Sequence, residues 1–174
     1  PIQQLMLGVG ASKKTYLDDV FSTYLYIGND GSQTINTGLD MSGEGGLLWV
    51  KDLGNATGHN LLDTERGVNK VIWSNSSNAE STEPYSQTFT STGFTFNTVY
   101  QGVNANNVEY SSWSFRKAPG FFDIVSYTGN GTSGRTFSHS LASQPGMVLI
   151  KNRDEGDSWV VYHKSIGATK MLTL

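Results

Sequence analysis

One sequence pattern occurs twice in this chain of 174 residues, about one hundred positions apart. The first copy contains Gly46-Leu-Leu-Trp-Val-Lys51 and ends in Gly67-Val-Asn-Lys-Val-Ile72. The second copy contains Gly146-Met-Val-Leu-Ile-Lys151 and ends in Gly167-Ala-Thr-Lys-Met-Leu172, and the copies align here without a gap. A unit that recurs at a fixed spacing predicts a chain built from repeated structural modules. We therefore expect an internal repeat of about 100 residues.

The types of residue that recur indicate whether the repeat serves structure or catalysis. Upstream, Tyr26-Ile-Gly-Asn29 and Leu39 match Tyr127-Thr-Gly-Asn130 and Leu141. Glycine and asparagine are turn residues, and leucine and tyrosine fill cores or pleated surfaces. No histidine, serine or acidic residue with a catalytic pattern is repeated. The repeat therefore predicts architecture rather than chemistry.

The composition predicts an all-β fold. The chain holds 20 glycines, and 11% of its residues are aromatic, which is the balance of many strands joined by tight turns. The strand candidates recur at spacings of roughly ten to fifteen residues, which suit an antiparallel β-sandwich or jelly roll. Only 13–21 could form a helical turn. Apolar or alternating runs of strand length lie at Phe21–Ile27, Gly46–Lys51, Asn69–Ser74, Gly93–Thr98, Glu109–Arg116, Gly120–Tyr127, Gly146–Asn152 and Ser158–His163.

The repeat divides the chain into an N-terminal arm at 1–23, a first β repeat at 24–119 and a second β repeat at 120–174. In the first copy, the strand candidates Phe94–Phe96 and Tyr110–Phe115 follow Ile72. The second copy has no counterpart of them, so we expect it to be incomplete. We also expect the chain to be the front part of a longer protein, because the apolar segment Met171–Leu174 would otherwise be an edge strand without its partner.

The arm contains apolar residues that a glycine-rich stretch separates from the repeats. We expect it to anchor the chain in an assembly by strand addition or by burial in a groove. An ordinary first strand is the alternative. The predicted assembly contact consists of Leu5, Met6, Leu7 and Val9.

Charge and hydropathy exclude several classes of partner. The net charge is −3 and only 16% of the residues are charged, so no basic surface for nucleic acid is expected. The apolar runs are far shorter than the roughly 20 residues that a membrane helix requires, so no membrane insertion is expected. The chain has no cysteine, which excludes disulfides and thiolate metal sites.

No pattern predicts a catalytic or cofactor site, so we expect no enzyme. His59, His139 and His163 lie far apart, and no Gly-x-Ser-x-Gly elbow is present. The acidic pair Asp18-Asp19 precedes a strand, and the acidic cluster 154–157 belongs to a turn. Neither provides two carboxylates across a cleft, as a glycosidase requires. A calcium ion would suit such loop oxygens, although the spacing is not that of an EF-hand.

Two tryptophans are candidates for stacking against a ligand. Trp49 and Trp113 lie within apolar or alternating strands and are expected in the core. Trp73 and Trp159 are the better candidates for a surface that stacks on sugars, with burial in a core as the alternative.

Several strings resemble a known family. They are Thr15-Tyr-Leu-Asp-Asp-Val-Phe-Ser-Thr-Tyr-Leu-Tyr26, Leu39-Asp-Met-Ser-Gly-Glu-Gly-Gly-Leu-Leu-Trp-Val-Lys51, Leu62-Asp-Thr-Glu-Arg-Gly67 and Trp113-Ser-Phe-Arg-Lys-Ala-Pro-Gly-Phe-Phe-Asp123. Together they resemble uncharacterised repeat domains of tailed bacteriophages, especially marine and cyanobacterial ones. The resemblance covers nearly the whole chain and implies a sandwich of the concanavalin or laminin-G type.

The resemblance also implies a role. We expect a virion structural protein, the N-terminal part of a tail fibre or appendage, which forms homo-oligomers and contacts other virion proteins through its arm. A lectin-like module that binds a host-surface glycan is the alternative, together with a capsid decoration protein. A polysaccharide hydrolase ranks last.

Overall fold

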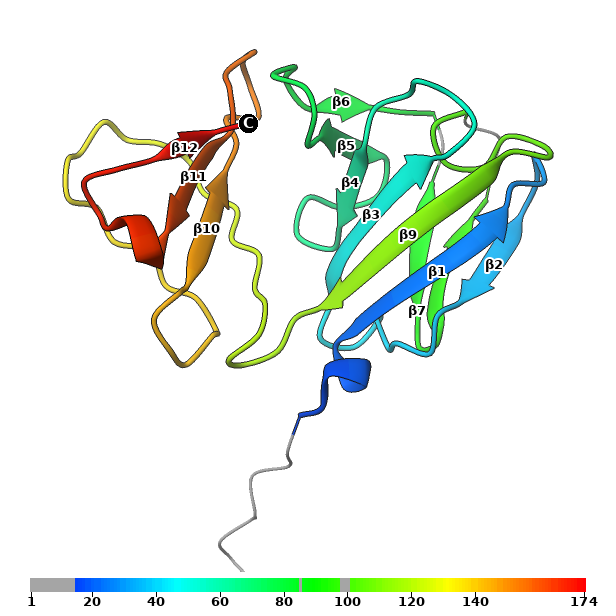
Figure 1. The fold of residues 1–174 in the computed structure, drawn as a ribbon, viewed down its shortest axis with the longest axis horizontal. Helices are drawn as coiled ribbons and strands as arrows, with labels where there is room; N and C mark the ends of the chain where they lie inside the picture. The colour runs from blue at the N-terminus through cyan, green and yellow to red at the C-terminus, as the bar shows by residue number, and fades with distance from the viewer. Residues whose placement is uncertain (1–14, 85, 98–100) are drawn as a thin grey trace, which may run out of the picture.

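The computed structural model describes residues 15–84, 86–97 and 101–174. Within these residues the chain is almost entirely β, and the sheets are antiparallel (Figure 1). Its only regular helices in the described part are two short 3-10 helices, η2 (Leu17–Asp19) and η3 (Lys164–Ile166). The all-β prediction is confirmed, and η2 falls inside the predicted helical turn at 13–21.

The largest sheet has six strands in the order β1-β9-β3-β4-β5-β6. A second sheet has the order β2-β8-β7, and a third has the order β10-β11-β12. The strands are β1 (Phe21–Ile27), β2 (Gln33–Asn36), β3 (Gly46–Asp52), β4 (Asn60–Asp63), β5 (Lys70–Trp73), β6 (Ser81–Thr82), β7 (Gln87–Thr90), β8 (Gly93–Phe96), β9 (Glu109–Arg116), β10 (Met147–Ile150), β11 (Val160–His163) and β12 (Leu172–Thr173).

The first two sheets share one hydrophobic core, as the sheets of a sandwich do. Alternate residues of β3 are buried, which directs Leu48 and Val50 into this core and Leu47 and Trp49 to the opposite face. Trp49, which was expected in the core, lies on the outer face by this period of two, where it is half-buried and packs against a second buried cluster. The buried core residues are Tyr26, Ile35, Leu48, Val50, Leu62, Val71, Phe94, Phe96, Val103 and Tyr110.

The third sheet has the pairing register of β3–β5, with each residue number higher by 100. Leu47 pairs with Asp63 and Met147 with His163, so 47 and 63 become 147 and 163. The next pair of strands behaves in the same way, since Leu61 pairs with Ile72 and Val161 with Leu172. Gly67 and Gly167 have φ angles of 90° and 83°, a region that favours glycine, at the same point of each connection.

The two regions differ in what flanks the ladder. β3 lies between β4 and β9, whereas β10 lies at the edge of its sheet, next to β11. The prediction of a strand at Gly120–Tyr127 is wrong, because this segment has no ladder there apart from one bridge between Ala118 and Phe122. The segment that corresponds to 120–127 in the first region is β1, and β1 forms its ladder with β9 alone. No described strand lies beside 120–127 as β9 lies beside β1.

Candidate functional site

The segment between β10 and β11 contacts the outer side of the large sheet, and this contact is the most developed site of the described chain. We call residues 15–119 the first unit and residues 120–174 the second unit. The indole of Trp159, just before β11, is buried against Leu61 and Ile72 of β4 and β5. Its Nε1 donates a hydrogen bond of 2.9 Å to the carbonyl oxygen of Trp73. Leu47 and Trp49 pack around this apolar centre of the interface.

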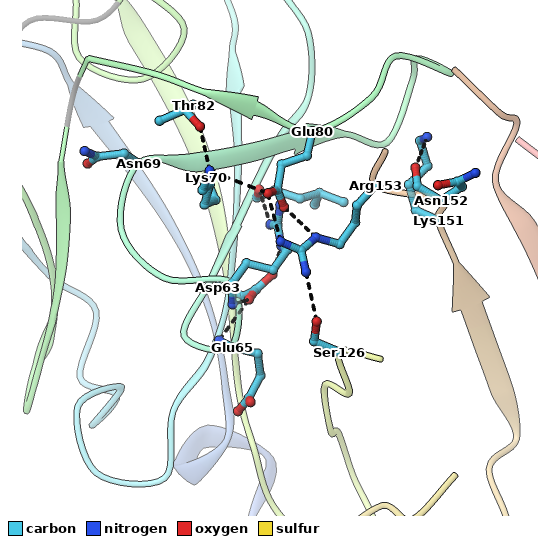
Figure 2. Close-up of polar contacts among 12 residues, drawn as sticks. Asp63, Glu65, Asn69, Lys70, Glu80, Thr82, Ser126, Lys151, Asn152 and Arg153 are labelled. Atoms are coloured by element: carbon cyan, nitrogen blue, oxygen red, sulfur yellow. Dashed lines mark hydrogen bonds and ion pairs between the residues drawn. The ribbon is translucent and has the colours of Figure 1, made fainter. Parts of the chain in front are cut away.

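An ion cluster borders the apolar centre. Glu80 of the first unit accepts two hydrogen bonds from Arg153 of the second, from Nε at 2.8 Å and from Nη2 at 2.9 Å (Figure 2). The backbone N–H of Glu80 also donates to the carbonyl oxygen of Arg153, at 2.8 Å. Nη1 of Arg153 donates to the hydroxyl of Ser126, at 2.9 Å. The guanidinium thus meets the carboxylate in a bidentate geometry, which gives strong and specific hydrogen bonds.

Arg66 extends the cluster into the first unit. Its Nε donates to Asp63 at 2.5 Å, and its Nη2 donates to the carbonyl oxygen of Leu61 at 2.7 Å. Its Nη1 reaches Glu80 at 3.4 Å, and Lys70 Nζ lies 3.9 Å from the same carboxylate. Only 5% of the side chains of Arg66 and Asp63 is exposed, so this part of the cluster is buried as well as neutralised.

Glu80 and Arg153 shift each other's pKa values toward the ionised forms. Burial raises the pKa of the Glu80 carboxyl, but the hydrogen bonds and charge of Arg153, together with Arg66, outweigh burial and hold the pKa below its ordinary value. The hydrogen bond to Glu80 raises the pKa of Arg153. The carboxylate therefore stays ionised at neutral pH and acts as an acceptor between the two units.

A second ionic contact joins the units at the other side. Lys117 Nζ lies 2.7 Å from Glu65 Oε1 and 3.4 Å from Asp123 Oδ1. The hydrogen bond to Glu65 is the main reason that the pKa of Lys117 is raised. Burial raises the pKa of Asp123, but the backbone N–H groups of Ser140 and Ile124 and the ammonium of Lys117 outweigh it, so its pKa is lowered. A cavity of about 300 Å³ lies here, lined also by His139.

The lysines at the ends of β3 and β10 make matching contacts. Lys51 Nζ donates to the carbonyl oxygens of Asp52 and of Asn55, the latter at 3.0 Å. Lys151 Nζ donates to those of Asn152 at 2.6 Å and Glu155 at 3.1 Å. Each ammonium therefore binds the carbonyls of the turn that follows its strand. These lysines are part of the turns.

The structure places the predicted stacking residues beside each other, yet not as an exposed pair. Trp159 is 5% exposed and lies in the interface, so its ring offers no open face to a ligand in this structure. Trp73 is half-buried, packs against the main core and donates from Nε1 to Asn60 at 3.0 Å. The predicted assembly contact of Leu5, Met6, Leu7 and Val9 lies outside the described residues.

The remaining candidates make separate local contacts. Nδ1 of His59 accepts a hydrogen bond from Trp49, that of His139 from the N–H of Leu141, and that of His163 from the N–H of Ser165. In the part of the chain that the structure describes, no three His, Cys, Asp or Glu side chains gather as a metal-binding group. Among the same residues, no helix is long and apolar enough to cross a membrane.

Sequence reasoning missed the charged residues that meet between the units, which are Glu80 with Arg153 and Lys117 with Asp123. Glu80 and Arg153 lie 73 positions apart, and the position that matches Arg153 in the first copy is Leu53. One signal was available in retrospect. Charged residues make up only 16% of the chain, so a charge that breaks the repeat pattern is a candidate for a contact between copies.

Comparison with protein families gives two matches to one family model, described as a domain of unknown function (DUF7483). The matches cover residues 17–121 and 118–174, and the first alone spans more than half of the chain. The chain belongs to this family. The two DUF7483 matches overlap at residues 118–121, which include the junction of the first and second units. No curated protein and no solved structure matches the chain significantly.

Proposed function

We propose that this DUF7483 protein is a structural protein that builds an extended assembly from repeated β units of about 100 residues. The observation that carries the proposal is the common pairing register of β3–β5 and β10–β12, with every residue number shifted by 100. Two matches to one family model, one for each unit, support it further.

The interface supports a mechanical role for the pair of units. It combines a buried tryptophan, a bidentate Glu80–Arg153 contact and the Lys117 contact, which lie at separate points. Contacts at several separate points oppose rotation of one unit on the other, whereas a single flexible linker would permit it. The units therefore act as a semi-rigid rod segment. The concanavalin-like topology that the resemblance implies and the jelly roll that the strand spacing suits both remain predictions.

The assembly that we propose is a bacteriophage virion. On this proposal the protein is the N-terminal part of a tail fibre or appendage, works as a homo-oligomer, and contacts other virion proteins through the arm at 1–23. It acts through rigid modules and subunit contacts, with no chemistry of its own. The support is the resemblance of the quoted strings to phage repeat domains.

Immunogold labelling tests this role directly. Antibodies raised against the purified chain are applied to purified particles of the phage that encodes it, and the labelled particles are imaged by electron microscopy. We expect gold at the tail or its fibres. Gold over the head surface would favour a capsid decoration protein instead. Particles without label, in a preparation where a known tail protein is labelled, would contradict the virion role.

One observation favours glycan binding as the second candidate. The rings of Tyr127 and Phe137 lie 4.0 Å apart and are 45% and 41% exposed, and Arg135 lies 4.7 Å from the Phe137 ring centroid. Exposed aromatic rings beside polar turns can stack on sugars. A glycan array probed with the chain and with Tyr127→Ala, with and without calcium, tests this candidate. Binding that Tyr127→Ala abolishes would support it, and no binding by the unaltered chain would contradict it.

A further inference from the structure

The second unit exposes the side chains that form the core in the first unit. Val50 of β3 and Val71 of β5 are fully buried. Their counterparts at positions higher by 100, Ile150 and Met171, are 39% and 66% exposed. A contiguous apolar face on a sheet normally packs against another element. We call the face formed by Val148, Ile150, Tyr162 and Met171 the open face.

The segment before β10 shows the same reversal. Tyr26 and Ile35 are 7% and 4% exposed, and both belong to the core of the first unit. In the aligned repeat they correspond to Tyr127 and Phe137, which are 45% and 41% exposed. The two aromatic rings pack against each other at an interplanar angle of 34°. Thus both the ladder and the segment that leads to it lack a cover that the first unit has.

The backbone of β10 is open on one edge. The N–H of Lys164 donates to the carbonyl oxygen of Gly146, so the backbone of Gly146 bonds toward β11. Hydrogen-bonded positions alternate along an antiparallel strand, so the backbones of Val148 and Ile150 bond in the same direction. The N–H and C=O groups of Met147 and Leu149 therefore face away from β11. Among the described strands, β11 is the one hydrogen-bonded neighbour of β10. An unpaired strand edge is a template for the addition of another strand.

The first unit shows what occupies the equivalent place. There Leu47 and Trp49 pair with Phe115 and Trp113 of β9, in antiparallel register. The face of β3–β5 that corresponds to the open face is covered by Phe94 and Phe96 of β8, both fully buried in the shared core.

We propose that the edge of β10 and the open face form a docking surface for a segment of the same family that carries a β8-type strand and a β9-type strand. The β9-type strand adds antiparallel to β10 through the backbone groups of Met147 and Leu149. The β8-type strand places two aromatic side chains on the open face, as Phe94 and Phe96 do in the first unit. The inference rests on the pairing registers and the burial, and it is independent of the virion role.

An extended chain tests the docking surface. Because Leu174 corresponds to Ser74, a copy of residues 75–121 added directly after Leu174 continues the repeat in register. Amide hydrogen exchange is measured by NMR for Met147 and Leu149 with and without the extension. We expect both amides to exchange about a hundredfold more slowly in the extended chain, because they become part of an interior ladder. Unchanged exchange at both amides would overturn the proposal.

A matched extension checks that the effect depends on the family's strand chemistry. It carries Phe94→Asp and Phe96→Asp in the added copy, and we expect it to leave the exchange of Met147 and Leu149 fast. Equal protection by this altered extension would contradict the proposal. A second copy of the chain is the other occupant to test. Protection that appears in the unextended chain and grows with concentration, together with a dimer in sedimentation, would overturn the proposal in favour of self-association.

A peptide provides a readout that does not require the extended chain to fold. A fluorescent copy of residues 87–116 is titrated into the unextended chain, and binding is followed by anisotropy. We expect saturable binding that Leu149→Pro abolishes, since this change removes the N–H that faces the open edge and leaves the bonds to β11 in place. Absence of binding, or binding that Leu149→Pro does not alter, counts against the docking surface.

Discussion

β3 pairs with β4, and β10 pairs with β11 in the equivalent register. On its other side β3 pairs with β9, whereas β10 is the edge strand of its sheet. In the first unit Leu48 and Val50 are fully buried, whereas Ile150 of the second unit is 39% exposed. The three-strand ladder forms in both units, so its register depends on local features: short connections, turn glycines and the lysine that binds the turn carbonyls. Burial depends on strands that are distant in sequence. The local ladder and the strands that cover it are therefore separable.

Equivalent substitutions in β3 and β10 are expected to differ most in their effect on the free energy of unfolding. Leu48→Ala removes a fully buried side chain and is expected to cost about 4 kcal/mol in the free energy of unfolding. Val148→Ala, at the counterpart position, is expected to cost less than about 1 kcal/mol, because this side chain is half-buried on an uncovered face. Urea unfolding of the two variants measures both values. Equal costs would show that the open face is packed in solution.

Removal of the tryptophan at the interface is expected to have the next largest effect. Trp159→Ala deletes a buried ring between the units and is expected to cost about 3 kcal/mol. The loss is expected in the second unit, so its amides exchange faster while those of β3 and β9 are unchanged. Hydrogen exchange with mass spectrometry resolves the two units. Uniform destabilisation of both would show that they unfold as one body.

The ion cluster is expected to contribute less. Glu80→Gln leaves Arg66 and Arg153 without their carboxylate and is expected to lower the free energy of unfolding by about 2 kcal/mol. This is less than for a fully buried ion pair, because 38% of the Arg153 side chain is exposed. Glu155→Gln, in the exposed turn, is the matched control and is expected to change stability by less than about 0.5 kcal/mol. Thermal unfolding compares them, and a Glu80→Gln effect as small as the control would show that the cluster does not hold the units together.

The pH dependence of the interface follows from the same group. The pKa of Glu80 is lowered from its ordinary value of 4.5 in the folded chain. Its stabilisation is therefore fully present above pH 4.5 and is lost as the pH falls through the lowered folded pKa. Fluorescence of Trp159 is expected to report loosening of the units below that pH. In Glu80→Gln this part of the transition should disappear, and an unchanged transition would assign it to other carboxyls such as Asp123.

Sequence reasoning predicted the strands whose pattern is local. β1 and β9 begin and end at the residues that alternation indicates, and β3, β10 and β11 fall within a few residues of prediction. It failed for 120–127, because an apolar run becomes a strand only when a partner completes its ladder. It left open whether Trp159 faces solvent or a core, since a pattern shows that two faces differ without showing which face meets another unit. The Glu80–Arg153 contact depends on how the units dock, which no local pattern encodes.

Amide hydrogen exchange of the unaltered chain, resolved by residue with NMR, tests the central comparison most directly. In β3 the amides of Leu47 and Trp49 pair with β9, and those of Leu48 and Val50 pair with β4, so all four are expected to be protected. In β10 we expect alternation: Val148 and Ile150 protected through β11, Met147 and Leu149 exchanging fast at the open edge. Uniform protection along β10, at concentrations where the chain is monomeric, would show that this edge of β10 is not open.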